Sequence, residues 1–557
     1  MSAGRAFITT PIYYVNDRPH IGHTYTTTLC DVWARATRLM GRETFFLTGT
    51  DEHGQKVEKS AREAGVSPQK LADTNAAEFR RVMDMMEFSH DDFIRTTEPR
   101  HMTQVQALVG KLAELGVVYL GEFEGWYDEG QEEYHTETRA RELDYKSPVS
   151  GRPLVRFKEQ NYYFRLSAFQ QRLEEFYSRH PEFVQPEGRF NEVKGRLREG
   201  LQDVPVTRTN FSWGIPFPGD PNHVIYVWID ALINYVSALG LAKSVNGAQL
   251  GPGAHLPEVQ DAPAPAAAEL AAQVQALHQS RGVLWPADLH VVGKEILWFH
   301  AVIWPAMLMA LELEPPRQIH AHSFWIRDGQ KMSKSMGNFL DLAAIEAFIA
   351  RYGLDAWRWY MATQGPLQAT DADFRAAHFH EVYTAELVNL VGNCASRVGA
   401  MIAKYCDGRM PADTGDASQW VTRCAEATAQ WRRAIEALDL TAAARAGLDL
   451  LRAVDAFIHQ TEPFKLAKDP ANSPQVHSIL AQCAQCVRVA GLLLAPFLPT
   501  KMDELARGFG EATPSAVTGR GCCEDNFAAR IEYGRIAVGT PIAKLALFPR
   551  LDAPKAA

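Results

Sequence analysis

Two histidines three residues apart, His20 and His23, are the first residues of the chain whose type and spacing suggest chemistry. They lie in residues 19–24, which follow an apolar strand expected over residues 6–10 and open a helix expected from about His20. A helix N-terminus presents unpaired backbone N–H groups and a positive dipole end, which together suit a phosphate. Gly22 leaves room for a flat ring to lie against the backbone. The pattern predicts a phosphate-binding turn in which both imidazoles donate hydrogen bonds to phosphoryl oxygens.

A second segment that could do chemistry, residues 331–338, is small and hydroxyl-rich and carries two cations, Lys331 and Lys334. Taken alone, a His-x-x-His at a helix start is usually a surface or packing feature, and a Lys-x-x-Lys is usually a solvated charge pair. A lysine charge on a mobile loop can nevertheless reach a triphosphate that a helix start already holds. The two segments together favour nucleotide chemistry over the two separate surface roles.

In this order and about 300 residues apart, the two segments resemble the paired motifs of class I aminoacyl-tRNA synthetases. Four further segments narrow the resemblance to the methionyl-tRNA synthetases, and it then covers nearly the whole chain. These segments are residues 11–16, residues 49–54, residues 226–235, and Phe299-His300 together with residues 304–308.

The resemblance implies three sets of site residues. The residues implied in catalysis are His20, His23, Lys331 and Lys334. The residues implied in ATP binding are His20, Gly22, His23, Gly293, Glu295, Lys331, Ser333, Lys334 and Ser335. The residues implied in methionine binding are Pro11, Ile12, Tyr14, Asp51, Trp228, Ala231, Leu232, Tyr235, Ile296, His300 and Trp304.

The resemblance also implies a two-step reaction. Methionine and ATP give methionyl-adenylate and pyrophosphate, and the methionyl group then moves to the 3′ end of methionine tRNA, the initiator form included. Asp51 would accept hydrogen bonds from the substrate ammonium group. Lys334 and secondarily Lys331 would neutralise the leaving pyrophosphate with the help of Mg²⁺.

The aromatic residues of the implied methionine site recur at helical spacing, for example Trp228 with Tyr235 and His300 with Trp304. From the pattern alone, such stripes are usually part of a hydrophobic core. The resemblance favours a pocket instead, and the chemistry agrees, because a thioether makes favourable contacts with aromatic rings. An aromatic wall also gives little binding energy to a polar rival side chain.

Composition is that of an ordinary globular protein. The chain has 557 residues, too many for one core, with 46% hydrophobic and 22% charged residues. It shows no N-terminal signal-like segment and no run of 18 apolar residues, so we expect a cytoplasmic protein without a membrane span. The net charge of −9 neither supports nor excludes a nucleic-acid partner, because a local basic strip can bind RNA on an acidic protein.

The pattern along the chain predicts an α/β protein with a doubly wound, Rossmann-type catalytic domain, an inserted connective domain and an all-α anticodon-binding bundle. The catalytic domain is expected in two halves, residues 1–118 and 224–330, with an Ala/Pro-rich insertion at 242–282 that is partly helical over 267–278. The connective domain is expected at 119–223, with short β-like pieces and turns. An α-rich linker at 331–376 and the bundle at 377–557 complete the order.

Cysteines are absent between Cys30 and Cys394. The connective domain of many family members holds zinc through paired cysteines, and here residues 127–131 and 147–150 occupy the expected ligand positions without a thiol. We therefore expect no structural zinc and no other bound metal except the Mg²⁺ that accompanies ATP. The one Cys-x-x-Cys, Cys483 with Cys486, lies in an apolar helical pattern and is predicted to be buried in a helix.

In the bundle, Asn393 and Arg397 stand four apart on one expected helix face, and the resemblance implies that they read the anticodon together with Phe464. Phe464 stands where the family more often has tryptophan, so it offers a smaller ring and no N–H group for stacking. The chain ends soon after residue 550, where some family members continue into a dimerising oligonucleotide-binding fold. A monomer is the expectation.

Other assignments fit less well. The isoleucine, leucine and valine enzymes share both motifs but carry an editing insertion for which roughly 105 connective residues are too few. The cysteine enzyme binds its substrate through a zinc ion held partly by cysteine, and this chain lacks cysteines in the required places. A small nucleotidyltransferase with His-x-x-His would not need a long helical bundle. A catalytically dead tRNA-binding paralogue would not need His20, His23, Asp51 and both lysines.

Overall fold

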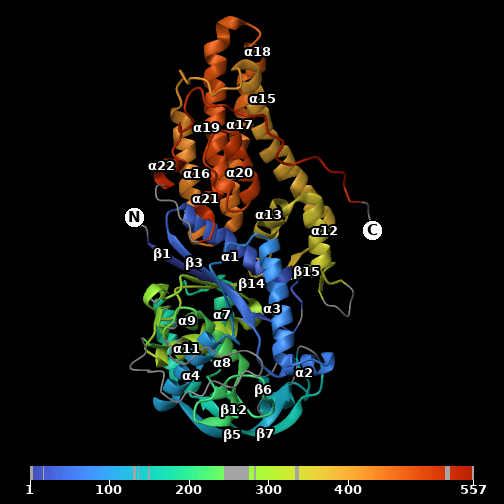
Figure 1. Ribbon diagram of the computed structural model, residues 1–557, viewed down its shortest axis with the longest axis vertical. Coiled ribbons are helices and arrows are strands. Elements are labelled where there is room, and N and C mark those ends of the chain that lie inside the picture. The colour runs from blue at the N-terminus through green and yellow to red at the C-terminus, as the bar shows by residue number, and fades with distance from the viewer. Residues whose placement is uncertain are drawn as a thin grey trace.

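The structure is a computed structural model that describes residues 4–16, 18–128, 133–135, 137–148, 151–243, 272, 275–276, 278–281, 284–332, 338–520 and 527–554. It is elongated, with a helical bundle at one end, a connective sheet at the other and a parallel sheet between them (Figure 1). The predicted α/β class, with a Rossmann-type sheet, inserted antiparallel sheets and a helical C-terminal region, is confirmed.

The central sheet is wholly parallel, with strand order β2-β3-β1-β13-β14-β8 and β4 paired to β3. Its strands are β1 (Arg5–Thr9), β2 (Tyr13–Tyr14), β3 (Glu43–Asp51), β4 (Asp92–Arg95), β8 (Val184–Gln185), β13 (Leu289–Gly293) and β14 (Ile319–His322). Strand β1 has β3 on one side and β13 on the other, so strand order reverses between β1 and β13. In sheets of this kind, ligands bind at the carboxyl ends of the strands beside such a reversal.

Helices cover both faces of the sheet, and alternate residues of each strand point to different cores. Ile8 and Phe46 belong to one core, whereas Phe7, Phe45 and Leu47 belong to the other. The helices of this region are α1 (Ile21–Leu39), α2 (Gln55–Ala64), α3 (Pro68–Met85), α4 (Pro99–Glu114), α8 (Val227–Leu232), α9 (Asn234–Ser237) and α11 (Trp304–Ala310). The first core continues without a break into the helical bundle.

The connective region is more regular than its sequence pattern indicates. Strand β5 (Val118–Asp128) is 11 residues long and pairs along ten positions with β7 (Val155–Phe164). The remaining elements are β6 (Glu133–His135), α5 (Glu137–Glu142), α6 (Gln170–Arg179), α7 (Glu187–Leu197), β9 (Val204–Pro205), β10 (Thr207–Arg208), β11 (Pro216–Phe217) and β12 (Asp220–Ile225).

Two helices and one strand in this region depart from the expectation of short β pieces. Helix α6 buries only Leu173 and Tyr177, four residues apart, so its polar surface hides the helical period. Helix α7 follows β8, which joins the edge of the central sheet beside β14 rather than a separate connective sheet. Pairing between distant segments of this kind leaves no local sequence signal.

After the sheet, the chain forms β15 (Trp325–Arg327), β16 (Gln330–Lys331), α12 (Leu342–Tyr352), α13 (Leu354–Gln364) and β17 (Ala372–Asp373). The bundle comprises α14 (Ala376–Val382), a π-helical segment Tyr383–Gly392, α15 (Asn393–Tyr405), α16 (Ser418–Glu436), α17 (Leu440–Thr461), α18 (Pro463–Leu466), α19 (Ser473–Leu494), α20 (Pro499–Gly508), α21 (Ser515–Thr518) and α22 (Phe527–Ile531).

Helix α19 is the central helix of the bundle. Among the described residues, the segment 470–494 is the one stretch long and apolar enough to cross a membrane, yet 94% of its apolar window is buried inside the protein. Its apolar composition is therefore explained by packing. Cys483 and Cys486 are buried in this helix, as predicted, and Cys486 Sγ lies 3.6 Å from Cys424 Sγ of α16.

Most of the Ala/Pro-rich insertion lies outside the described residues, and so do Ser333, Lys334 and Ser335. Within the part of the insertion that is described, residues 275–276 and 278–281 are helical.

Close strand packing beside the proposed site makes a stability prediction possible. A Cβ at Gly49 of β3 would overlap the backbone carbonyl oxygen of Ile94 in β4. We expect Gly49→Ala to lower the free energy of unfolding by about 1–3 kcal/mol, because a backbone atom cannot move aside as a side chain can. Chemical denaturation measures this change. Gly195→Ala in α7 is the control, because a Cβ there would meet no atom within 4 Å, and an equal loss in both variants would contradict the argument.

Candidate active site

The two histidines cap the N-terminus of α1 as a reciprocal pair. The N–H of Gly22 donates to Nδ1 of His20 at 3.1 Å, and the N–H of His20 donates to Nδ1 of His23 at 3.2 Å. A nitrogen that accepts a hydrogen bond holds no hydrogen, so each neutral ring carries its hydrogen on Nε2. Both imidazoles therefore stabilise the helix start with one nitrogen and keep the other as a donor.

Gly22 lies directly against one of the two capping histidines. A Cβ there would lie 3.0 Å from Cε1 of His20, so the glycine makes room for the ring of this capping histidine. The rings of His20 and His23 lie 3.8 Å apart, and His23 also packs against Tyr13 and Phe79 at 4.8 and 5.1 Å. Burial lowers the pKa of His23 well below its ordinary value, and neighbouring His20 adds to this effect. His23 is thus neutral at physiological pH.

Across the strand reversal, the carboxyl end of β13 holds Gly293 and Glu295. The Glu295 carboxylate folds back over Gly293, into the place that a Cβ would take. Lys331, at the end of β16, lies with Nζ 5.5 Å from the ring centroid of Phe324, and Lys294 approaches the same ring at 4.5 Å. Both cations also lie close enough to Glu295, just beyond the end of β13, to act on its carboxylate.

Asp51 is the last residue of β3 and is buried, 4% exposed. Its backbone pairs with Tyr14 of β2, and the Tyr14 hydroxyl donates to the carbonyl of His53 at 3.2 Å. The neighbouring Glu52 accepts two hydrogen bonds from the Arg95 guanidinium, at 2.7 and 2.9 Å. This bidentate pair holds the strand end, and with it Asp51, in one position.

The predicted aromatic residues meet beside this strand end. His300 Nδ1 lies 2.9 Å from the carbonyl of Ile296, which can only accept, so Nδ1 donates. Nε2 of His300 then accepts from the Tyr235 hydroxyl at 2.8 Å. The ring of Tyr235 lies 6.0 Å from that of Trp304, which is wholly buried. Burial lowers the pKa of His300 to about 4, so the cluster carries no charge near neutrality.

A π-helical turn, Phe299–Ile303, carries His300 and precedes α11. Such turns interrupt the regular spacing of an α-helix and are frequent at functional sites. Phe299 stacks on Trp228 with centroids 4.2 Å apart. Ala231 and Leu232 are buried in α8, and Ile12 and Ile296 pack against the same core. Pro11 lies in the segment between β1 and β2.

Two buried residues of the site were not predicted. His290 of β13 stacks on Tyr235 at 4.2 Å and shares a 2.7 Å hydrogen bond with Thr9 of β1. Asp230 of α8 lies 2.7 Å from a ring nitrogen of both His53 and His101. His290 could have been found as a polar residue in an apolar strand at the reversal, but nothing in the sequence pairs Asp230 with its two histidines.

The predicted anticodon residues lie in the bundle. Asn393 and Arg397 are both in α15, and Arg397 lies 3.7 Å from Asp455 of α17. Phe464, in α18, is 38% exposed. Helices α15 and α18 are at the end of the bundle away from the central sheet (Figure 1). The predicted anticodon residues thus belong to helices of the bundle, whereas the histidine turn opens α1 at the central sheet.

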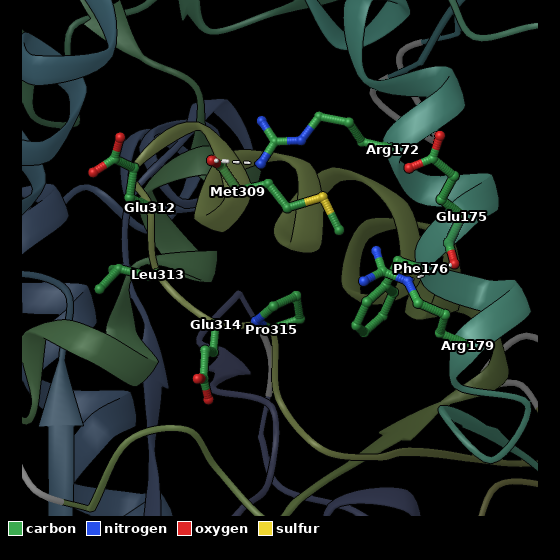
Figure 2. Close-up of a pocket in the computed structure, with 9 residues that line it drawn as sticks. All are labelled: Arg172, Glu175, Phe176, Arg179, Met309, Glu312, Leu313, Glu314 and Pro315. Atoms are coloured by element: carbon green, nitrogen blue, oxygen red, sulfur yellow. Dashed lines mark hydrogen bonds between the residues drawn. The ribbon is translucent and has the colours of Figure 1, made fainter.

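A separate cavity of about 390 Å³ lies between α6 and the segment that follows α11 (Figure 2). Its apolar floor includes Phe176, Leu313 and Pro315, and charged side chains surround it. The segment leads into the amino end of β14, so the cavity lies at the sheet edge opposite the histidine turn. None of the predicted site residues lines it.

The comparisons with known proteins agree with this geometry. The family described as tRNA synthetases class I (M) matches residues 6–143, 140–250 and 273–399. The methionine–tRNA ligase of Bacillus subtilis is 37% identical over 98% of this chain and 78% of its own length. That of Streptomyces coelicolor is 38% identical over 99% of this chain and 97% of its own length. The structure of Mycobacterium tuberculosis methionyl-tRNA synthetase with methionyl-adenylate matches with a TM-score of 0.84 and 32% identity, over 98% of this chain and all of that chain.

The doubly wound sheet, the capped histidine turn at its strand reversal and the C-terminal bundle define a class I aminoacyl-tRNA synthetase. Within this class, the chain belongs to the methionine–tRNA ligase family.

Buried neutral histidines make the stability of the protein depend on pH. The pKa of His300 is about 4 in the folded protein, whereas an unfolded histidine has a pKa of about 6.5. Below pH 6.5 the unfolded chain therefore binds a proton that the folded protein does not, and stability is lost as the pH falls toward 4. We expect a loss on the order of 2 kcal/mol at pH 5 from this residue.

His300→Gln tests this prediction, because glutamine does not titrate. The variant should lose less thermal stability between pH 7.5 and pH 5 than the unmodified protein, as measured by melting temperature. Equal losses in the two proteins would show that His300 is not buried in its neutral form.

Proposed function

We propose that this chain joins methionine to methionine tRNA, the initiator form included, in two steps. Methionine and ATP first give methionyl-adenylate and pyrophosphate, and the methionyl group then moves to the 3′ end of the tRNA. The observation that carries the proposal is the meeting, at one edge of the sheet, of a helix start capped by two imidazoles and a neutral aromatic cluster. The first suits phosphates, and the second suits an apolar side chain.

Methionine would bind with its ammonium group on Asp51 and its thioether among Trp228, Tyr235 and Trp304. Sulfur near aromatic ring edges is favourable, and the buried rings leave little for a polar competitor. The Tyr235 hydroxyl donates to His300, which fixes the orientation of the ring that would face the thioether. Pro11, Ile12, Tyr14, Ala231, Leu232 and Ile296 would complete the pocket.

The methionine carboxylate would attack the α-phosphorus of ATP and displace pyrophosphate. The Nε2–H groups of His20 and His23 would donate to phosphoryl oxygens as charge develops on them. Gly293 and Glu295 would contact the ribose, and Lys331 with Ser333, Lys334 and Ser335 would hold the leaving pyrophosphate. The attacking group is already an ionised carboxylate, so no side chain needs to remove a proton from it. No side chain needs to act as a covalent nucleophile either.

Mg²⁺ would enter with ATP, held chiefly by phosphate oxygens. Among the described residues, no group of three or more His, Cys, Asp and Glu side chains could hold a metal ion.

A connective domain without zinc is part of the proposal. It is supported by the side chains that join β5 to α5 and to the turn after α5, near the expected ligand positions. Trp126 Nε1 and the Tyr145 hydroxyl both donate to the Glu137 carboxylate, at 2.7 and 2.9 Å, and the two rings lie 4.6 Å apart. These hydrogen bonds, with that from Trp126 contributing most, lower the pKa of Glu137.

The remaining parts of the proposal concern the whole molecule. Residues 1–118 and 224–330 would form the catalytic domain, 119–223 the connective domain, 331–376 the linker that contacts the tRNA stem, and 377–557 the anticodon-binding domain. Asn393, Arg397 and the exposed ring of Phe464 would read the anticodon. We propose a cytoplasmic monomer; light scattering at micromolar concentration tests the monomeric state.

Amino-acid-dependent exchange of labelled pyrophosphate into ATP tests the proposed function. The assay is run separately with methionine, isoleucine, leucine, valine and cysteine, with Mg²⁺ but without added zinc. We expect exchange with methionine alone, because only its thioether suits the aromatic cluster. No exchange with any amino acid would contradict the proposal, and restoration only by added zinc would contradict the zinc-free connective domain.

The second motif is tested by Lys334→Ala. Loss of the Lys334 charge, which would neutralise the leaving pyrophosphate, should slow adenylate formation by about 10² to 10³ with little change in methionine affinity. Stopped-flow measurement of adenylate formation separates the two quantities. Lys146→Ala, at an exposed position of the connective region, is the matched control and should react normally. A near-normal rate for Lys334→Ala would exclude the proposed role.

A further inference from the structure

Helix α1 connects the histidine turn with the helices at the base of the bundle. Its N-terminus holds His20 and His23, and its body packs against α13 and α21. Figure 1 shows α1 and α13 at the junction where the bundle meets the sheet. One continuous hydrophobic core runs from the sheet through this junction into the bundle. Buried charges in such a core require a specific explanation.

Asp31 of α1 is the centre of a buried polar cluster. It is wholly buried, and its Oδ1 accepts from the N–H and the hydroxyl of Ser89, both at 2.6 Å. Its Oδ2 accepts from Arg35 at 2.7 Å and from Arg358 at 2.5 Å. Four donors from three segments of the chain thus converge on one carboxylate.

Arg358 carries this cluster into the bundle. It lies in α13 and is wholly buried. The same Nη2 that donates to Asp31 also lies 3.3 Å from the carbonyl oxygen of Pro496, between α19 and α20. Its Nη1 lies 3.4 Å from the carbonyl oxygen of Met86. One guanidinium therefore contacts α1, the segment after α3 and the bundle.

Two further buried groups join the same parts. Arg38 of α1 donates to Asp91 at 2.6 Å and reaches the carbonyl of Thr518, at the end of α21, at 3.4 Å. Asp355 of α13 accepts from the N–H of Lys501, in the first turn of α20, at 2.6 Å. Buried charged side chains thus contact the backbone of the bundle at three points, namely Pro496, Thr518 and Lys501.

The charges of this cluster contribute more to orientation than to stability. Burial alone would raise the pKa of Asp31, but Arg35, Arg358 and the Ser89 hydrogen bonds hold it well below the usual range, so Asp31 is ionised. Desolvation offsets most of the attraction in a buried ion pair, whereas each hydrogen bond still demands a particular geometry. A cluster with this geometry favours one angle between α1 and the bundle.

We propose that Asp31 and Arg358 are positioning residues that hold the anticodon-binding bundle in register with the histidine turn, so that one tRNA reaches both sites at once. This inference rests on the proposed function. It predicts a loss confined to the step that needs both sites, because adenylate formation uses only the sheet edge.

Asp31→Asn and Arg358→Gln test this proposal through three measurements. These are methionine-dependent pyrophosphate exchange, charging of full-length methionine tRNA, and charging of a minihelix that contains only the acceptor stem. We expect exchange and minihelix charging to stay within about threefold of the unmodified protein. The kcat for full-length tRNA should fall by about 100-fold, since a displacement of about 1 Å can cost that much. Affinity for the isolated anticodon stem-loop should not change.

Arg81→Gln is the matched control. It breaks an exposed ion pair between α3 and Glu346 of α12, with side chains 49% and 44% exposed, and should leave all these quantities unchanged. Arg358→Lys keeps the positive charge but loses the forked geometry of the guanidinium. It is used in place of Asp31→Asn or Arg358→Gln if either of these variants does not fold. It should show the same selective loss.

Three results would overturn the proposal. One is a fall by the same factor in full-length and minihelix charging, another is unchanged charging of full-length tRNA, and the third is an equal selective loss in Arg81→Gln. Failure of the proposed function would look different, because the unmodified protein would then show no methionine-dependent exchange.

Discussion

The proposed active site depends on the way in which the first helix begins. The backbone N–H groups of a helix start need acceptors, and in α1 two of the N–H groups at this point find them in the Nδ1 atoms of His20 and His23. Because these atoms accept, both rings are fixed in one tautomer and one orientation. The same interaction that completes the helix thus prepares two donors for a phosphate.

The parallel sheet brings the remaining chemistry to this helix start. Strand β1 and the short strand β2 precede the histidine turn, β3 ends at Asp51, and β13 ends at Gly293. Their common direction places all three ends at one edge of the sheet, on both sides of the strand reversal. The aromatic cluster adds a neutral, buried wall in which His300 serves as an acceptor for Tyr235. Charged and apolar surfaces therefore lie side by side, as a substrate with an ammonium group and a thioether requires.

Much of this arrangement could be predicted from the sequence, because strands, helix starts and paired motifs have local signals. The fold class, the buried Cys-x-x-Cys helix and the family followed from such signals. Other features arise only from long-range packing. Gly22 faces the ring of His20, the polar surface of α6 hides its helical period, and β8 pairs with a strand far along the chain. The histidine partners of Asp230, and the Ser89 and Arg358 partners of Asp31, come from separate segments, and no spacing rule joins them.

The tautomeric state of His20 and His23 tests the central claim most directly. Long-range ¹H–¹⁵N correlation spectra of protein labelled at histidine, assigned with His20→Asn and His23→Asn, distinguish a hydrogen on Nε2 from one on Nδ1. The structure predicts the Nε2–H form for both rings at pH 7.5. A hydrogen on Nδ1 of either ring would contradict the capping arrangement and, with it, the prepared pair of phosphate donors.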